Sequence, residues 1–188
     1  VFEPFVSPRA NAMTDMFCRE GLARAARSLL SAYADGSNTS AREDMAFASL
    51  LGGMALANAG LGAVHGFAAP LGGMLAAPHG AICAALFPAV TLVNICALRQ
   101  RQPDNPVLER YREAARILTG QPAADVDDGP RIIQEMVTAM RIPGLGSYGL
   151  DTAVIPILVE RAAQASSMKA NPILLSGAEL VEILERSL

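Results

Sequence analysis

The sequence predicts an all-α domain, a bundle of helices, from three observations. Apolar residues recur at helical spacing in several segments, and helix start and stop signals bracket those segments. No run alternates apolar and polar residues between hairpin turns. Because 52% of the 188 residues are hydrophobic, the chain can bury a large core without a disulfide or a metal. We therefore expect residues 1–188 to form one helical domain.

Two helices are predicted in the first part of the chain. An amphipathic helix ends at about Ala34, where Gly36 supplies a stop signal. Ser40 and Glu43 have the spacing of a capping box, in which each side chain accepts a hydrogen bond from a free backbone N–H group at the start of a helix. A second helix is therefore expected to start there.

The helices of the second part have clearer boundaries. Residues 79–98 form an apolar stretch that predicts a buried helix, bent near Pro88. Asn105 and Pro106 predict an N-cap with proline at the first helical position, and Gly120 predicts the end of the same helix. Further helices are predicted over residues 131–141, 152–165 and, after a capping box formed by Ser176 and Glu179, 179–188.

Charge and composition exclude several partners. The net charge is −3, aromatic residues make up 5% of the chain, and tryptophan is absent, so a nucleic-acid-binding surface is not expected. The three cysteines, Cys18, Cys83 and Cys96, lie in apolar surroundings, which predicts reduced, buried thiols in a cytoplasmic compartment. The chain begins with Val1 and without a cleavage signal, so we expect it to be part of a longer protein.

One long segment resembles a membrane-spanning sequence. Residues 45–98 contain no Asp, Glu, Lys or Arg. A spanning helix needs about 20 consecutive apolar residues, whereas Gly, Pro, Asn and His interrupt this segment repeatedly. We therefore expect core helices without membrane contact, and a membrane channel is the alternative interpretation.

The only two histidines, His65 and His79, lie inside this uncharged segment. On one unbroken helix they would be about 21 Å apart, too far to share a ligand. Gly72, Gly73 and Pro78 break such a helix, so we expect a helix, a turn and a second helix that brings the two imidazoles together, with His79 at a helix N-terminus.

The residues alone allow two interpretations of this histidine pair. The histidines are either hydrogen-bonded core residues or part of a functional site. A catalytic metal site needs three or four protein donors, and no nearby Asp, Glu or Cys is expected to supply the others. The segment Gly60–Gly66 misses the dinucleotide-binding fingerprint by one residue and follows no predicted strand, so no nucleotide is expected there.

The segment NAGLGAVHGFAAPLGGMLAAPHGAICAALFP resembles the signature of the iron-containing (group III) alcohol dehydrogenase family. In that signature a G-x-x-H motif is followed fourteen residues later by P-H-G, as it is here at His65 and His79. The segments EPFVSPRANAMTD and SSMKANPILLSGAELVEIL resemble the two ends of the family's C-terminal domain. The resemblance implies the all-helical C-terminal domain of a two-domain, dehydroquinate synthase-like fold, without its N-terminal nucleotide-binding domain.

The same resemblance implies a function for the full-length protein. It would transfer hydride between an alcohol and NAD or NADP, with the nucleotide bound mainly by the missing domain, and its substrate would be a small alcohol, aldehyde or keto compound. The family's metal, here Fe²⁺ or Zn²⁺, is held by an Asp and a His that would precede Val1 and by two histidines that match His65 and His79. These two are therefore the catalytic and metal-ligand candidates. The resemblance also leaves room for a homodimer.

One departure from the family keeps alternatives open. Many members carry a further histidine where this chain has Ala69. A metal-free enzyme similar to maleylacetate reductase, in which the imidazoles donate hydrogen bonds to the substrate, is one alternative, and a non-enzymatic helical scaffold is another. With only two donors, the chain alone is expected to be inactive and to bind Zn²⁺ or Fe²⁺ weakly. Phe67 and Lys169 are candidates for substrate contact, with a core role and a solvated loop role as their alternatives.

Overall fold

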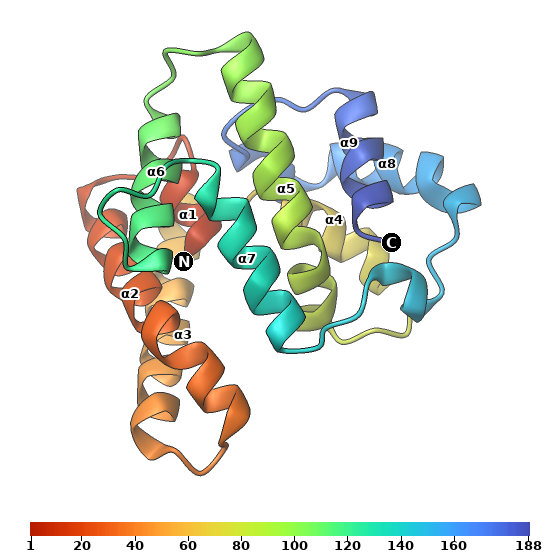
Figure 1. The fold of residues 1–188 in the computed structure, drawn as a ribbon. Coiled ribbons are helices and arrows are strands. Elements are labelled where there is room, and N and C mark those ends of the chain that lie inside the picture. The colour runs from red at the N-terminus through yellow and green to blue at the C-terminus, as the bar shows by residue number, and fades with distance from the viewer.

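A computed structural model describes all 188 residues and contains only helices. The predicted all-α fold is therefore confirmed (Figure 1). The α-helices are α1 (Phe2–Val6), α2 (Ala12–Ala34), α3 (Thr39–Ala59), α4 (Ala63–Gly72), α5 (His79–Arg101), α6 (Val107–Thr119), α7 (Asp128–Ala139), α8 (Ile155–Gln164) and α9 (Gly177–Arg186). Three short 3₁₀ helices complete the fold: η1 (Leu145–Tyr148), η2 (Thr152–Val154) and η3 (Ser166–Ala170).

Helix α5 lies at the centre of the bundle. Helices α6 and α7 pack on one side of it and α4 and α9 on the other (Figure 1). Its length and composition would allow it to cross a membrane, but 61% of its most apolar window is buried inside the molecule. The charge-free sequence of α5 thus serves the hydrophobic core, a single cluster of 35 buried residues. Pro88 lies inside this helix without dividing it.

Helices α2 and α3 form a hairpin that projects from one end of the bundle (Figure 1). Asp44 on α3 joins the two helices, because its carboxylate accepts hydrogen bonds from Arg24 and Arg27 of α2 at 2.7 Å each and from the Ser28 hydroxyl at 2.6 Å. This ion-pair cluster fixes one helix of the hairpin against the other.

The predicted end of the first helix is confirmed, but the capping box at Ser40 is wrong. Helix α2 ends at Ala34, whereas α3 begins at Thr39. The side chain of Asn38 caps α3 by accepting a hydrogen bond from the Ala41 N–H at 3.1 Å. Ser40 lies within the first turn and is not needed as a cap, because Asn38, two residues earlier, already satisfies a free donor.

Several other predicted boundaries are confirmed. Helix α5 begins at His79, directly after Pro78. Gly120 ends α6 in the left-handed conformation, with φ 67°. Ser176 and Glu179 form the predicted capping box of α9. Helix α6 begins at Val107, and Pro106 before it already has helical backbone angles (φ −60°, ψ −16°). The Asn105 side-chain oxygen accepts a hydrogen bond from the Val107 N–H at 3.0 Å, as expected of the predicted N-cap.

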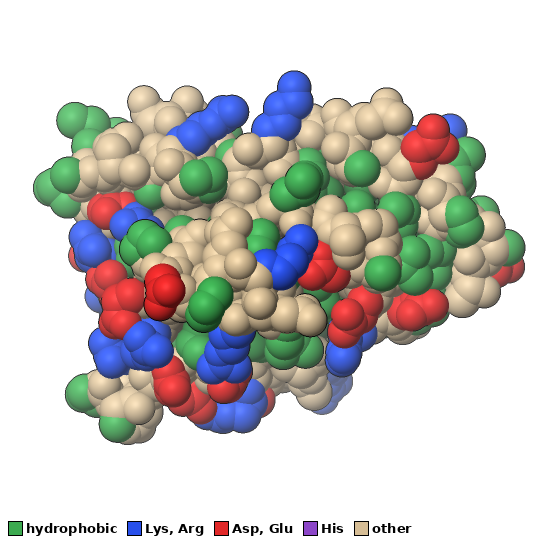
Figure 2. All heavy atoms as spheres, turned by 90° about the horizontal axis from the view of Figure 1, so that it is seen from above, with side chains coloured by type: hydrophobic (Ala, Val, Ile, Leu, Met, Phe, Trp, Pro, Cys, Tyr) green, Lys and Arg blue, Asp and Glu red, His purple; other side chains and the backbone are tan.

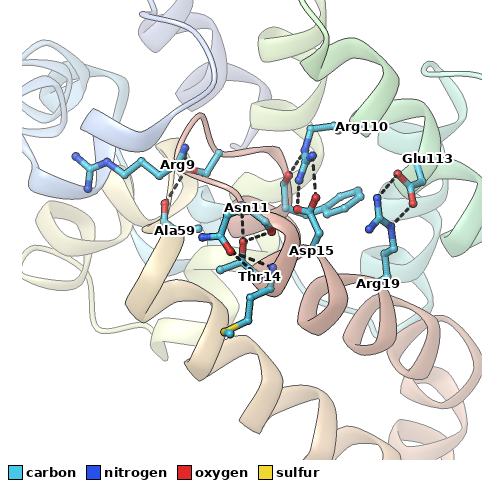
Figure 3. Close-up of polar contacts among 11 residues, drawn as sticks. Arg9, Asn11, Thr14, Asp15, Arg19, Ala59, Arg110 and Glu113 are labelled. Carbon is cyan, nitrogen blue, oxygen red and sulfur yellow. Dashed lines mark hydrogen bonds and ion pairs between the residues drawn. The ribbon is translucent and has the colours of Figure 1, made fainter.

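Helix α1 is short, yet a polar network holds it firmly (Figure 3). Arg110 of α6 donates a hydrogen bond to the Phe5 carbonyl at 2.6 Å and pairs with Asp15 of α2. Arg19 of α2 pairs with Glu113 of α6 beside it. Because this network ties α1 to two longer helices, the residues on α1 have a fixed position relative to the core.

Basic and acidic side chains are mixed on the surface. On the face shown in Figure 2, basic side chains mostly lie next to acidic ones and do not gather into one basic surface.

All three cysteines are free, but only Cys18 is buried, since Cys83 is half-buried and Cys96 is exposed. The prediction that all three thiols are buried is therefore wrong, because α5 presents one side of its apolar sequence to solvent at Cys96.

Candidate functional site

The two histidines lie side by side at the N-terminal ends of α4 and α5. A turn over residues 73–78 reverses the chain between the two helices, as the Gly72, Gly73 and Pro78 signals predicted. The imidazole ring centroids of His65 and His79 are 5.5 Å apart. His65 is half-buried and His79 is exposed, so the pair is open to solvent on one side.

A third side chain, Cys83, joins the pair. It follows His79 by four residues on α5, and residues at this spacing share one face of a helix. Its Sγ atom is 3.5 Å from His79 Nε2 and 4.0 Å from His65 Nε2. One ligand atom from each of the three residues lies within 4.8 Å of the others. No other group of three His, Cys, Asp or Glu side chains in the chain has this arrangement.

The Glu3 carboxylate on α1 orients His65. Its Oε2 atom is 2.5 Å from His65 Nδ1, and its Oε1 atom accepts a hydrogen bond from the Val64 N–H at 2.8 Å. Because Glu3 occupies Nδ1, the Nε2 atom of His65 points toward Cys83. Contacts with Cys83 and with Glu3 raise the pKa of His65 to about 9, although burial acts against this shift. The Glu3 contact is the shorter of the two, so we regard it as the stronger restraint on the ring.

Side chains from distant segments also cap the helix that carries His65. Besides the Glu3 contact to Val64, the Asn171 side-chain oxygen accepts a hydrogen bond from the Ala63 N–H at 3.1 Å. Asn171 is itself held by Asn94 of α5 through a hydrogen bond of 2.7 Å. A Cβ atom on Gly62 would lie 2.9 Å from the Glu3 Oε1 atom and 3.0 Å from the Asn171 Oδ1 atom. Only glycine therefore lets both capping groups approach the start of α4.

An apolar cavity of about 360 Å³ adjoins the cluster. Glu3, His65 and Cys83 form part of its wall. Most of the remaining wall is aliphatic, with contributions from α2, α6, α7 and the residue after α7 that include Leu29, Leu118, Ile133, Met136 and Met140. A few polar groups on an otherwise apolar wall are typical of a small-molecule site.

The expectation that no Glu or Cys lies near the histidines is wrong. Glu3 is 62 residues from His65 in sequence, and only the packing of α1 against the core brings the two together. The position of Cys83 has a signal in the sequence, because the spacing of four residues from His79 on a predicted helix places both side chains on one face. Its apolar surroundings favour the opposite interpretation, a thiol buried in the core.

The other two predicted site residues lie elsewhere. Phe67 is fully buried in the hydrophobic core and does not line the 360 Å³ cavity, so we assign it a packing role. Lys169 is exposed on η3, which packs against α4 through the contact of Met168 with Gly66. The structure does not bring Phe67 or Lys169 to the cluster of His65, His79 and Cys83.

Comparison with known proteins gives consistent matches over the whole chain. The family model described as "Fe-containing alcohol dehydrogenase family, C-terminal" matches residues 1–188. The chain is 35% identical to 1,3-propanediol dehydrogenase of Citrobacter freundii, over 98% of this chain and 47% of that protein. It is 32% identical to alcohol dehydrogenase 4 of Saccharomyces cerevisiae (strain ATCC 204508 / S288c), over 98% of this chain and 47% of that protein.

A solved structure agrees with these sequence matches. The chain superposes on 1,3-propanediol oxidoreductase with a TM-score of 0.89 and 31% identity, covering 99% of this chain and 48% of that one. The chain thus spans about half the length of the relatives that it matches. From the complete family match and the shared helical fold, we conclude that this chain belongs to the Fe-containing alcohol dehydrogenase family, of which it is the C-terminal helical domain.

Proposed function

We propose that this domain supplies the metal and substrate site of an NAD(P)-dependent alcohol dehydrogenase. The full-length protein would oxidise a small alcohol, with hydride passing to the nicotinamide and a proton leaving the hydroxyl group, and would also catalyse the reverse reduction. The observation that carries the proposal is the pairing of His65 and His79, whose rings lie 5.5 Å apart beside an apolar cavity.

The residues of this cluster fit a divalent metal. Imidazole nitrogen is a ligand that both Fe²⁺ and Zn²⁺ accept, and we propose that His65 and His79 hold one of these ions. A carboxylate that binds the second ring nitrogen of a ligand histidine, as Glu3 does at His65, is the usual support for such a ligand. When bound, the ion would supply Lewis-acid polarisation of the substrate oxygen.

The chain's own residues would bind and orient the substrate. The aliphatic wall formed by residues such as Leu118, Ile133 and Met136 would pack against the carbon chain of an alcohol and exclude water from the reacting centre. Glu3 would keep His65 in one orientation throughout, because both carboxylate oxygens are engaged. The 360 Å³ volume suits a small alcohol, aldehyde or keto compound.

The remaining parts of the reaction belong to the rest of the full-length protein. We propose that an N-terminal α/β domain binds NAD or NADP, because the chain spans 47% of its relative from Citrobacter freundii. The three free cysteines are consistent with a reducing compartment, and we propose a cytoplasmic location. A homodimer and a role for Lys169 in substrate contact stay predictions.

The half-buried cluster favours this proposal over both alternatives. A metal-free enzyme needs only hydrogen-bond donors at the substrate, whereas the convergence of ligand atoms of His65 and His79 within 4.8 Å of each other suits one shared ion. A scaffold needs neither a cavity nor an oriented histidine at its wall.

Alcohol-dependent reduction of NAD⁺ and NADP⁺ by the full-length protein tests the proposal. We expect turnover with small primary alcohols such as 1,3-propanediol. His65→Ala and His79→Ala should each lower kcat/KM by about 10²–10³-fold or more, the cost of losing one group that stabilises the developing charge. Asn58→Ala, at an exposed position on α3, is the matched control and should leave turnover unchanged. Normal turnover in both histidine variants would contradict the proposal.

A further inference from the structure

We propose that a buried water molecule links the hydroxyl group of Tyr111 on α6 to the Glu3 carboxylate on α1, and that Tyr111 is thereby a positioning residue for His65. The water site itself involves only residues of this chain. The positioning role deepens the proposed function and rests on it, because His65 holds a metal only under that function.

A small cavity beside the start of α4 provides the space for this water. Its volume is about 10 Å³. A single water molecule needs about 10–15 Å³ and two to four hydrogen-bonding partners. The wall of the cavity is partly apolar, and its polar side chains are Glu3, Thr91, Asn94, Tyr111 and Asn171. The size and the polar groups together favour one bound water.

The two asparagines on this wall differ in the hydrogen-bonding capacity that they have left. The Asn171 oxygen accepts from the Ala63 N–H and from the Asn94 amide, at 3.1 Å each. The Asn171 amide donates to the Asn94 oxygen at 2.7 Å and to the Ile173 carbonyl at 2.8 Å, so Asn171 is fully satisfied. Asn94 uses only one of its two N–H groups, although its side chain is buried. Its second N–H therefore needs a partner inside the molecule.

Tyr111 brings a hydroxyl group to the same wall. The residue is only 2% exposed, and a buried tyrosine hydroxyl usually finds a hydrogen-bond partner. Burial raises the pKa of Tyr111 above its usual range, the nearby Asn94 amide acts against this shift, and the charge of Glu3 adds to it. The hydrogen bonds of ordinary geometry that Asn94 makes both go to Asn171, so the Tyr111 hydroxyl is left without a protein partner.

The Glu3 carboxylate supplies the acceptor that completes the site. An ionised carboxylate has about four acceptor positions, and Glu3 uses one for the Val64 N–H and one for His65 Nδ1. A water that accepts from the Tyr111 O–H and the Asn94 N–H can donate to Glu3. It would then have three partners, within the range that retains a buried water.

This water would connect α6 to the candidate metal ligand. The group that binds the second nitrogen of a ligand histidine fixes the orientation of its ring, and a further hydrogen bond to Glu3 would restrict the carboxylate in turn. Helix α6 already holds α1 nearby, because Arg110 donates a hydrogen bond to the Phe5 carbonyl at 2.6 Å. Tyr111 contacts neither the substrate cavity nor His65, so it would act only through Glu3.

Crystal structures of the full-length wild type and of Tyr111→Phe test the water. In the wild type we expect one water within about 2.5–3.2 Å of the Tyr111 hydroxyl, the Glu3 carboxylate and the Asn94 amide nitrogen. Tyr111→Phe keeps the ring and removes only the oxygen, so the fold should persist while the water is lost or less occupied. Tyr33→Phe, the same change at an exposed position on α2, is the control and should retain the water.

Two crystallographic results would overturn the proposal. One is a wild-type structure without this water, in which the Tyr111 hydroxyl bonds directly to Asn94 or Glu3. The other is a water of unchanged occupancy in Tyr111→Phe, because the hydroxyl would then have no part in binding it.

Zn²⁺ affinity tests the positioning role, measured by competition with a chromogenic chelator. We expect Tyr111→Phe to raise the Kd about 5-fold, the weight of one ordinary hydrogen bond, and Tyr33→Phe to leave it unchanged. In a Glu3→Gln background Tyr111→Phe should change the Kd by less than about 2-fold, because the neutral amide already holds the His65 ring less firmly. A merely structural tyrosine would give the same ratio of Kd values in both backgrounds.

The outcomes separate this inference from the proposed function. An unchanged Kd in Tyr111→Phe, or an equal rise in both backgrounds, would overturn the positioning role and leave the metal site standing. Failure of the wild type to bind Zn²⁺ would overturn the proposed function and the positioning role together, whereas a water seen in the crystal would still support the water site.

Discussion

Glu3 and His65 form a carboxylate–imidazole contact of 2.5 Å between the N-terminal helix and the helix that carries the histidine motif. The same carboxylate accepts a hydrogen bond from the Val64 N–H at 2.8 Å, so one side chain both caps α4 and sets the orientation of the imidazole. Arg110 in turn fixes α1 by donating a hydrogen bond to the Phe5 carbonyl (Figure 3). The position of the candidate ligand therefore depends on segments that are far apart in sequence.

Replacement of Glu3 should weaken metal binding without removing a ligand. We expect Glu3→Gln to raise the Kd of the full-length protein for Zn²⁺ about 10–100-fold, because the neutral amide holds the His65 ring less firmly. Competition titration with a chromogenic chelator measures this effect. Glu43→Gln, at an exposed position, is the control and should not change the Kd. An unchanged affinity in Glu3→Gln would show that the carboxylate has no part in orienting the ligand.

Substitution of Gly62 should destabilise the protein through the cap of α4. In Gly62→Ala the new Cβ atom would lie 2.9 Å from Glu3 and 3.0 Å from Asn171, and would displace their side-chain oxygens from two backbone N–H groups. We expect a loss of about 1–3 kcal/mol in the free energy of unfolding, measured by urea denaturation.

Gly53→Ala provides the contrasting variant on α3. A Cβ atom at Gly53 meets nothing within 4 Å, and alanine in a helix interior is favoured over glycine by about 0.5–1 kcal/mol. We therefore expect a small gain in stability there. An equal response of the two variants would contradict the close approach that we describe at Gly62.

The hairpin of α2 and α3 should lose stability in acid through Asp44. Hydrogen bonds from Arg27 and Ser28, together with the charge of Arg24, hold the pKa of Asp44 well below its usual range. Because the pKa is lower in the folded state, the favourable contribution is complete above the unfolded value of about 3.9 and is lost as the pH falls through the folded value.

A comparison of wild type with Asp44→Asn across pH measures this contribution. The difference in free energy of unfolding between the two proteins should be largest at neutral pH and should shrink below about pH 4. Asp104→Asn, at an exposed position, is the control and should differ little from wild type at any pH. A difference that stays constant from pH 7 to pH 3 would rule out the proposed linkage.

The thiols should differ strongly in reactivity. Burial, the largest influence, raises the pKa of the Cys18 thiol to about 11, whereas Cys96 is exposed. At pH 7 we expect iodoacetamide to modify Cys18 at least about 100-fold more slowly than Cys96, because the thiolate is the reactive form and access is closed. Mass spectrometry of peptides from the native and urea-unfolded protein measures the two rates. Rapid modification of Cys18 in the native protein would contradict its buried position.

The sequence by itself determined the helical class and most helix boundaries. Helical periodicity and local signals such as Gly120 and the capping box at Ser176 act within one or two turns, so they can be read without knowledge of the rest of the chain. The turn between α4 and α5 is also a local consequence of Gly72, Gly73 and Pro78, which is why the approach of the two histidines could be predicted.

Only the tertiary structure decided the composition of the site. Glu3 reaches His65 across 62 residues because α1 packs into the core, and no local pattern carries that information. The capping of α4 by Asn171 spans 108 residues for the same reason. Cys83 is the intermediate case. Its spacing from His79 is visible in the sequence, but whether its thiol faces an imidazole or the core depends on how α5 is rotated, and packing against the neighbouring helices sets that rotation.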